Sequence, residues 1–124
     1  MARYRGNEVL LLRMTADLLM RNGEANRVEH RMAVIRFGSS ASVDVPFTSA
    51  RHILSRLNAM QYEDRGETNV LAAFAEAEKL FRSLPASTER RRAIVLLTDG
   101  VPYVRGGDMP SYRANLRQFA AAHF

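Results

Sequence analysis

The chain has 124 residues, enough to bury one hydrophobic core but too few for two ordinary ones, so we expect a single domain over residues 1–124. Its composition, 47% apolar and 25% charged, is that of a globular domain, and the absence of cysteine excludes disulfides, thiolate metal ligands and a cysteine nucleophile. Although the net charge is +5, the sequence does not favour nucleic-acid binding. The arginines are spread from Arg3 to Arg117 without the interleaved aromatic residues of a stacking platform.

The first predicted element is an amphipathic helix over residues 7–22. The apolar residues that recur there at helical spacing are Leu11, Met14, Leu18 and Leu19. Gly23 follows, and glycine most easily adopts the left-handed conformation found at helix ends. The pattern therefore predicts that this helix stops at Gly23.

Two strands are predicted next. The run RMAVIRF (residues 31–37) is apolar enough to be a buried strand, and the turn-forming stretch GSSAS follows it. A second strand, VDVPF (residues 43–47), contains Pro46, which cannot donate a ladder hydrogen bond. We therefore expect the second strand to lie at an edge of the sheet.

Two helices come after these strands. Thr48 can cap a short helix over residues 49–59, whose inward face would consist of Ile53, Leu54 and Leu57. After the polar loop QYEDRGETN, residues 70–84 give the clearest helical pattern of the chain, which Pro85 ends. The apolar positions of that pattern are Val70, Phe74, Ala77, Phe81 and Leu84.

The run RRRAIVLLTDG predicts a last strand over residues 93–98, and a helix is expected over residues 111–123 with Tyr112, Leu116 and Phe119 on one side. Buried strands that alternate with amphipathic helices are typical of an α/β fold whose largely parallel sheet is covered on both faces. In such sheets ligands bind outside the carboxyl ends of the strands. Asp99, which follows the last predicted strand, is therefore a candidate site residue.

Asp99 and Thr68 are the residues from which a metal site can be built. A carboxylate at the end of a buried strand needs a cation, a hydrogen-bond donor or water as its partner. Mg²⁺ keeps several waters and accepts a few hydroxyl and carboxylate oxygens from separate loops. The alternative interpretation is that Thr68 is only an N-cap and that Asp99 is a turn former before Gly100.

Other kinds of site find little support. The sequence contains no nucleophile elbow, P-loop or glycine-rich dinucleotide turn, and its histidines lie apart at His30, His52 and His123. Three acidic residues precede Thr68 and could join a cation site: Glu63, Asp64 and Glu67. The simpler interpretation is that they form a solvated acidic loop. We predict neither a targeting segment nor a membrane span, because no apolar run approaches the roughly 20 residues that a span requires.

Three stretches together resemble successive signatures of the von Willebrand factor type A domain. They are RMAVIRFGSSASV, GETNVLAAFAEAEKLF and RRRAIVLLTDGVP, and they occur in the family's order. The resemblance implies a Rossmann-like, doubly wound and mostly parallel open sheet with helices on both faces. It also implies a metal-ion-dependent adhesion site at the carboxyl edge of that sheet.

The resemblance implies roles for particular residues of this site. The family's second-loop threonine corresponds to Thr68, and its third-loop aspartate corresponds to Asp99. The implied cation is Mg²⁺, with Mn²⁺ or Ca²⁺ as alternatives. The residues that would form a partner-binding rim beside it are Glu67, Asn69, Gly100 and Tyr103.

One part of the family's pattern is absent from this sequence. The first loop, an Asp-x-Ser-x-Ser motif, supplies two serine hydroxyls to the metal, and no such motif occurs here. Met1 corresponds to the methionine that often follows the motif, and FAAAHF resembles the helix that leads into the next strand. The sequence thus resembles the middle of a type A domain, incomplete at both ends, and we expect metal binding to be weak or absent. GSSAS is a poor substitute for the first loop, because it lacks the leading acid.

The missing first strand has a physical consequence. In the family this strand lies between those that match residues 32–37 and 93–98, so its loss leaves two rows of ladder hydrogen bonds unmade. Unpaired buried backbone groups cost about 1–3 kcal/mol each, which is large beside net stabilities of about 5–15 kcal/mol. Either the two neighbouring strands close up on each other, or a strand from outside this chain segment takes the empty place, or the isolated chain folds only marginally.

The first functional hypothesis is a protein-binding module, not an enzyme, whose cation engages a glutamate or aspartate of the partner. The alternative is a metal-free structural or interaction fragment, completed by a strand from a partner or in a strand-swapped homodimer. The resemblance also allows, without favouring it, an accessory subunit of an ATPase or chelatase system. Intrinsic catalysis is not indicated, because no nucleophile lies beside a base.

Overall fold

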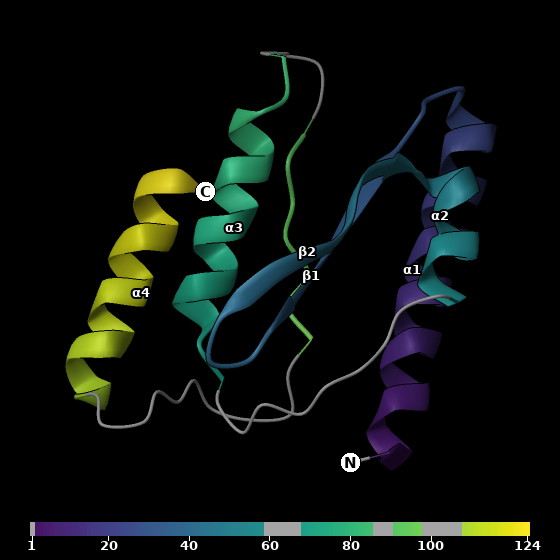
Figure 1. The fold of residues 1–124 in the computed structure, drawn as a ribbon. Coiled ribbons are helices and arrows are strands. Elements are labelled where there is room, and N and C mark those ends of the chain that lie inside the picture. Colours follow the sequence, from purple (N-terminus) through teal and green to yellow (C-terminus); the bar gives the residue numbers. More distant parts are fainter. Residues whose placement is uncertain (1, 59–67, 86–90, 98–107) are drawn as a thin grey trace. The chain divides into compact units, whose positions relative to one another are not determined.

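The structure is a computed structural model in which residues 2–58, 68–85, 91–97 and 108–124 are described. Its elements are α1 (Ala2–Asn26), β1 (Arg31–Phe37), β2 (Ala41–Ser49), α2 (Ala50–Asn58), α3 (Val70–Arg82) and α4 (Met109–His123) (Figure 1). The chain divides into an N-terminal unit of residues 1–34 and 43–64 and a C-terminal unit of residues 35–42 and 65–124. The base of the β1–β2 hairpin thus belongs to the N-terminal unit and its tip to the C-terminal unit.

The N-terminal unit has a small hydrophobic core between α1, α2 and the base of the hairpin. The buried residues of this cluster are Ala16, Val34, Val45, Ile53 and Leu57. Ile53 and Leu57 are 0% and 1% exposed, and Leu54 packs against the cluster. The predicted inward face of the short helix α2 is therefore confirmed.

Helix α1 continues past Gly23 to Asn26, so the predicted stop at Gly23 is wrong. The left-handed residue is Arg27, whose φ is 55°, and the Val28 N–H donates to the Gly23 carbonyl over 2.9 Å. This is the hydrogen bond of a helix end at which a left-handed residue turns the chain back. Gly23 has a different role, because a Cβ atom there would lie 2.4 Å from the Val28 carbonyl oxygen. The glycine thus lets the chain pass close over the last turns of α1.

Helix α1 buries a different side from the one that its periodic residues mark. Ala16 is fully buried and Leu12 packs against the core. The exposed apolar side chains form what we call the α1 stripe, which consists of Leu10, Leu11, Met14 and Leu18 at 53%, 46%, 53% and 65% exposure. Helical spacing correctly predicted the helix here, but not which side of it faces the core.

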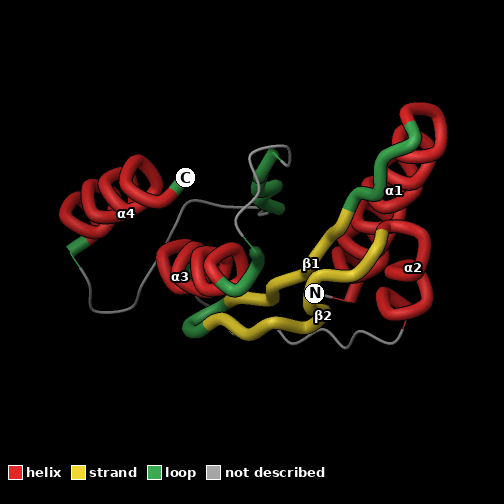
Figure 2. Tube along the Cα trace, turned by 90° about the horizontal axis from the view of Figure 1, so that it is seen from above, coloured by secondary structure: helices red, strands yellow, loops and turns green. Residues whose placement is uncertain are grey.

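The two predicted strands form an antiparallel hairpin (Figure 2), with β2 longer at both ends than the predicted strand. The Gly38 N–H donates to the Ser40 carbonyl over 2.8 Å in the turn. A connection this short allows only antiparallel pairing, because parallel strands need a crossover of a dozen residues or more. The α/β class is therefore seen, whereas the described residues do not contain the expected parallel, doubly wound sheet.

The start of α2 differs from the prediction. Thr48 was expected to cap the helix, but it lies in β2 and its hydroxyl donates to the Pro46 carbonyl over 2.8 Å. Ser49 occupies the position before the helix, with its hydroxyl 2.7 Å from Nδ1 of His52. The Ala50 N–H donates to the His30 carbonyl over 2.9 Å and so ties the start of α2 to the start of β1.

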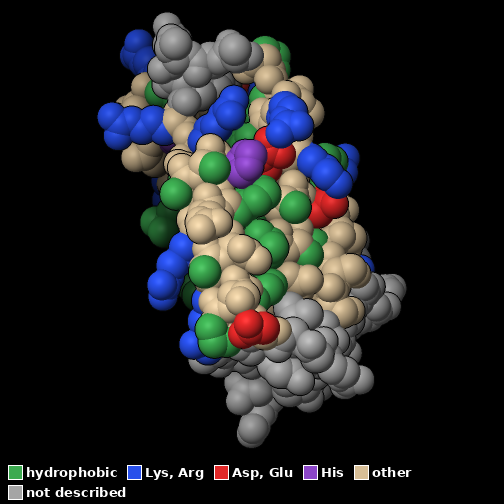
Figure 3. Space-filling model, turned by 90° about the vertical axis from the view of Figure 1, so that its left-hand side faces the viewer, with side chains coloured by type: hydrophobic (Ala, Val, Ile, Leu, Met, Phe, Trp, Pro, Cys, Tyr) green, Lys and Arg blue, Asp and Glu red, His purple; other side chains and the backbone are tan. Residues whose placement is uncertain are grey.

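In the C-terminal unit, aromatic side chains join α3 to α4. The ring centroid of Phe124 lies 5.5 Å from that of Phe74 and 6.1 Å from those of Phe81 and Phe119. Such ring pairs contribute about 0.5–1.5 kcal/mol each beyond the area they bury. Both helices agree with their predicted ranges to within two residues. Seen from the α4 side, hydrophobic side chains lie exposed among charged ones (Figure 3).

Residues 91–97 contain no strand, so the prediction for residues 93–97 is wrong, and Thr98 lies outside the described residues. The three central apolar side chains, Ile94, Val95 and Leu96, are 37%, 70% and 41% exposed. The Arg92 guanidinium lies 5.5 Å from the centroid of the Phe81 ring. A strand needs a neighbour for its backbone groups, and the described sheet consists of β1 and β2 alone. The composition suits a strand, but no described strand pairs with it.

Candidate metal site

Thr68 lies two residues before the first residue of α3 and is half-buried. The N-cap of α3 is the next residue, Asn69, whose Oδ1 accepts a hydrogen bond from the Ala72 N–H over 3.2 Å. The alternative interpretation of Thr68 as the helix cap is therefore wrong. Within the described residues, the Thr68 carbonyl accepts from the Val70 N–H over 3.1 Å, and no hydrogen bond of its hydroxyl is found.

Asn69 also fastens the start of α3 to the hairpin turn. Its backbone N–H donates to the Gly38 carbonyl over 2.9 Å, and its Nδ2 donates to the Ser39 carbonyl over 3.2 Å. The GSSAS stretch, considered above as a hydroxyl loop, thus contributes carbonyl oxygens that hold Asn69. Both ends of the Asn69 side chain have partners within the chain, so its amide is part of the framework around Thr68.

Tyr112, in the first turns of α4, completes this network. Its hydroxyl donates to Asn69 Oδ1 over 2.7 Å and accepts from the Leu71 N–H over 2.8 Å. The helical spacing predicts Tyr112 on the apolar side of the last helix and assigns no function to its hydroxyl. The available signal was that a partly buried tyrosine hydroxyl requires a hydrogen-bond partner, and that a helix start offers free N–H groups.

The remaining candidate residues, Glu67, Asp99, Gly100 and Tyr103, lie outside the described residues, and their roles stay predictions. Among the described residues, no three histidine or acidic side chains gather into a group that could hold a metal. A hydroxyl from Thr68 and a carboxylate from Asp99 are nevertheless hard oxygen donors of the kind that Mg²⁺ prefers. In their chemistry, these residues therefore fit a divalent cation.

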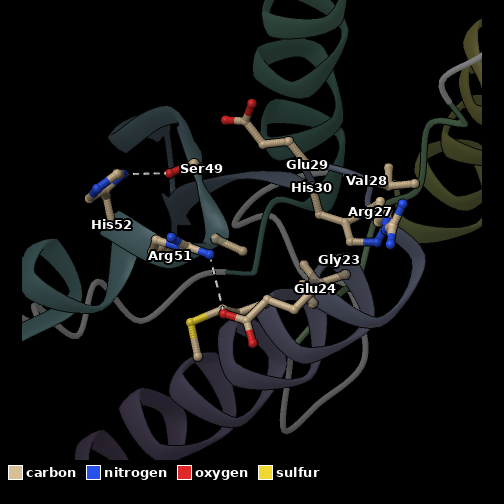
Figure 4. A pocket seen from close by; sticks show the side chains of 12 residues that line it. Gly23, Glu24, Arg27, Val28, Glu29, His30, Ser49, Arg51 and His52 are labelled. Carbon is tan, nitrogen blue, oxygen red and sulfur yellow. Dashed lines mark hydrogen bonds and ion pairs between the residues drawn. The ribbon is translucent and has the colours of Figure 1, made fainter.

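A separate pocket of about 460 Å³ lies in the N-terminal unit, between the end of α1 and the start of α2 (Figure 4). Arg51 Nη2 is 3.2 Å from Glu24 Oε1 across it, and both groups are more than half exposed. Two of the three histidines line it and have local partners, since His30 Nε2 is 2.9 Å from Asn22 Oδ1 and His52 contacts Ser49. The pocket contains none of the predicted site residues.

The third histidine, His123, lies in the C-terminal unit. Its ring centroid is 4.3 Å from that of Phe119, and its Nδ1 is 3.7 Å from Glu78 Oε1. The described histidines thus pack against or bond to nearby side chains. No helix in the described part of the chain is both long enough and apolar enough to cross a membrane.

Comparison with known proteins shows which family matches the part of the chain that contains the candidate site residues. The von Willebrand factor type A domain family matches residues 3–101, a span that includes Thr68, Asn69 and Asp99. No curated protein and no solved structure gave a significant match. The family match covers most of the chain and agrees with the three signatures seen in the sequence. The chain therefore belongs to the von Willebrand factor type A domain family.

Proposed function

We propose that this chain is a protein-binding module in which Thr68 and Asp99 hold a divalent cation that engages an acidic side chain of the partner. Domains of this family are generally non-enzymatic interaction modules. The observation that carries the proposal is the capping of α3 by Asn69, which leaves the Thr68 hydroxyl without a capping function at the start of the helix. A bound cation supplies a positive charge with open positions for a carboxylate oxygen.

The rim beside this site would select the partner. Glu67, Gly100 and Tyr103 are proposed to contact it, because they neighbour the two ligand residues in the sequence. Asn69 belongs to the same rim, but its side chain already has intrachain partners, so we assign it the task of holding the rim in place. The net charge of +5 favours approach of an acidic partner, mainly at low salt.

Replacing Thr68 by alanine should weaken metal binding, because one of the two proposed oxygen ligands is lost. We expect binding to the native chain to be weak, on the order of 10⁻³ M, since the serine-rich first-loop motif does not occur in the sequence. Mn²⁺ is a suitable probe, because its paramagnetism broadens nearby amide resonances even at low occupancy. Titration should broaden the Thr68, Asn69 and Leu71 signals, and excess Mg²⁺ should reverse the effect.

Three further variants control this experiment. Thr68→Ser keeps a hydroxyl and should retain the broadening, whereas Asp99→Ala should lose it. Thr48→Ala removes a threonine hydroxyl that bonds to the Pro46 carbonyl in the other unit and should change nothing at Thr68. Broadening that is the same in Thr68→Ala and Asp99→Ala as in the native chain would refute the proposed site.

A second candidate function is supported by the exposed apolar run of residues 93–97. Composition makes this run a good strand, yet it is unpaired within the described residues, and its side chains from Ala93 to Leu96 are exposed. An exposed, strand-forming segment can bind by adding to the sheet of another chain. We propose, as the alternative to the metal-dependent module, completion by a strand from a partner or from a second copy of this chain.

The two functions differ in their dependence on metal. Light scattering of the purified chain over a concentration series, with and without a chelator, separates them. A dimer that persists in chelator would support strand completion, and a monomer at all concentrations would rule out the strand-swapped homodimer.

A further inference from the structure

Helix α1 has apolar side chains on two opposite sides, and the core of the N-terminal unit uses one of them. Ala16 is fully buried and Leu12 packs against the same cluster, on the side where α2 lies along α1 (Figure 1). At 3.6 residues per turn, the α1 stripe points nearly opposite to Leu12 and Ala16. Its side chains are 46–65% exposed. Within the described residues, this face of α1 is therefore uncovered.

The layout of the α1 stripe indicates which partner it fits. Leu10, Met14 and Leu18 are four residues apart, so Met14 has a leucine about one turn before it and another about one turn after it. A second α1 laid antiparallel across the stripe, with a two-fold axis at Met14, sets Leu10 against Leu18 of the other copy. The same axis sets Met14 against itself. Two-fold interfaces require a self-complementary surface of this kind, because one patch serves both copies.

The charges beside the stripe fit the same arrangement. Arg13, Asp17 and Arg21 form a row along one flank, in which Arg21 Nε lies 3.0 Å from Asp17 Oδ2. In the antiparallel pair this flank adjoins the same flank of the other copy, and Asp17 comes within about one turn of Arg13 from that copy. Opposite charges then border the apolar contact at two symmetric places, as they do beside a coiled-coil seam. A parallel pair would set the row against the flank of Thr15, which is uncharged.

The area of the stripe determines how strong the contact can be. The exposed parts of its four side chains amount to about 400 Å² per copy, so pairing buries about 800 Å² of apolar surface. Specific interfaces bury about 1,200–2,000 Å², and smaller ones are weak and transient. We therefore expect a dissociation constant on the order of 10⁻⁴ M. At a few micromolar the chain is then a monomer, and unfolding measured there reports the monomer.

We propose that the α1 stripe is a self-association surface, through which two copies of this chain pair antiparallel along α1 about a two-fold axis at Met14. The contact uses neither Thr68 nor Asp99, so it is independent of the proposed metal site. It also differs from strand completion, which uses residues 93–97. The pair presents every other surface of the chain twice, so a partner with repeated sites would bind it more tightly than it binds the monomer.

Sedimentation of the purified chain in chelator, over about 5–500 µM, tests the proposal. The native chain should pass from monomer to dimer across this range. Met14→Glu should raise the dissociation constant about tenfold or more, because the axis sets the two new carboxylates against each other. Met14→Lys should do the same, and an equimolar mixture of the two variants should dimerise again. A native chain that stays monomeric throughout, or Met14→Glu that dimerises like the native chain, would overturn the proposal.

A matched variant separates this surface from strand completion, which also predicts a dimer in chelator. Leu96→Glu places the same charge on a side chain that is 41% exposed in the run of residues 93–97. This variant should still dimerise. Loss of the dimer in Leu96→Glu but not in Met14→Glu would assign the contact to the strand and contradict the proposal. Circular dichroism checks that each variant is folded, as the exposure of both positions predicts.

Single cysteines determine the direction of pairing, because the native chain contains none. Under mild oxidation, Leu10→Cys and Leu18→Cys should form a disulfide with each other when the two variants are mixed. Neither variant alone should crosslink, since the antiparallel pair keeps identical positions apart except at Met14. Crosslinking of Leu18→Cys to itself, without the mixed product, would show a parallel pair and refute the two-fold axis at Met14.

Discussion

Replacing Leu57 by alanine should lower the free energy of unfolding by about 2–5 kcal/mol. Leu57 is 1% exposed and packs in the core of the N-terminal unit with Val34, Val45 and Ile53. Truncation removes buried methyl groups and leaves a cavity that this small cluster can only partly close. Because net stabilities are about 5–15 kcal/mol, the loss would be a large fraction of the total. Urea denaturation followed by circular dichroism measures it as a lower midpoint.

Leu18→Ala is the matched control for this experiment. The chemical change is the same, but Leu18 is 65% exposed in the α1 stripe, so we expect a change within about 0.5 kcal/mol. Equal losses in the two variants would show that the core is not where the structure places it.

Gly23→Ala is the second prediction with a large effect, and its sign is the informative part. Inside a helix, glycine is usually less favourable than alanine by about 0.5–1 kcal/mol, so the substitution would ordinarily stabilise. Here the new Cβ would lie 2.4 Å from the Val28 carbonyl oxygen, which is backbone and cannot rotate away. We therefore expect a destabilisation of about 1–3 kcal/mol, measured by the same urea denaturation.

A gain in stability from Gly23→Ala, which is the usual result of this substitution inside a helix, would contradict the close passage of the chain over the end of α1.

The predictable part of the fold consists of the elements whose local patterns agree with their packing. The strand over residues 31–37 was predicted from its apolar run, and α3 was predicted from its helical period. The end of α1 was not predictable from Gly23, because the residue that takes the left-handed conformation is Arg27, a type without that preference. Which residue takes this conformation depends on where the chain turns back at the end of α1, and residue type alone does not state that position.

The strand expected over residues 93–98 illustrates a different limit. Its composition is correct for a strand, but a strand is defined by hydrogen bonds to a neighbour, and a local sequence cannot state whether that neighbour is present. The same limit applies to the type of sheet, of which the described residues contain only one strand pair. Pairing direction depends on the connection, and the short turn at residues 38–40 makes the β1–β2 pair antiparallel.

For the candidate site, the sequence indicated Thr68 and Asp99 through the family resemblance, and the family match confirms the resemblance itself. The local pattern could not decide between Thr68 and Asn69 as the cap of α3, since both residue types cap helices well. For Tyr112, the sequence indicated at most that the hydroxyl needs a hydrogen-bond partner, and it could not identify that partner. The contact with Asn69 joins residues 43 positions apart, and only the packing of α4 on α3 brings them together.

The exposed run of residues 93–97 also affects how this chain behaves at high concentration. A short window rich in β-branched and aliphatic residues, without charge or proline, is the composition that favours fibrillar aggregation. In this sequence the window follows directly on Arg91 and Arg92, whose charges oppose the stacking of identical copies. We therefore expect the arginines that precede Ala93 to limit this aggregation, independently of any metal or partner.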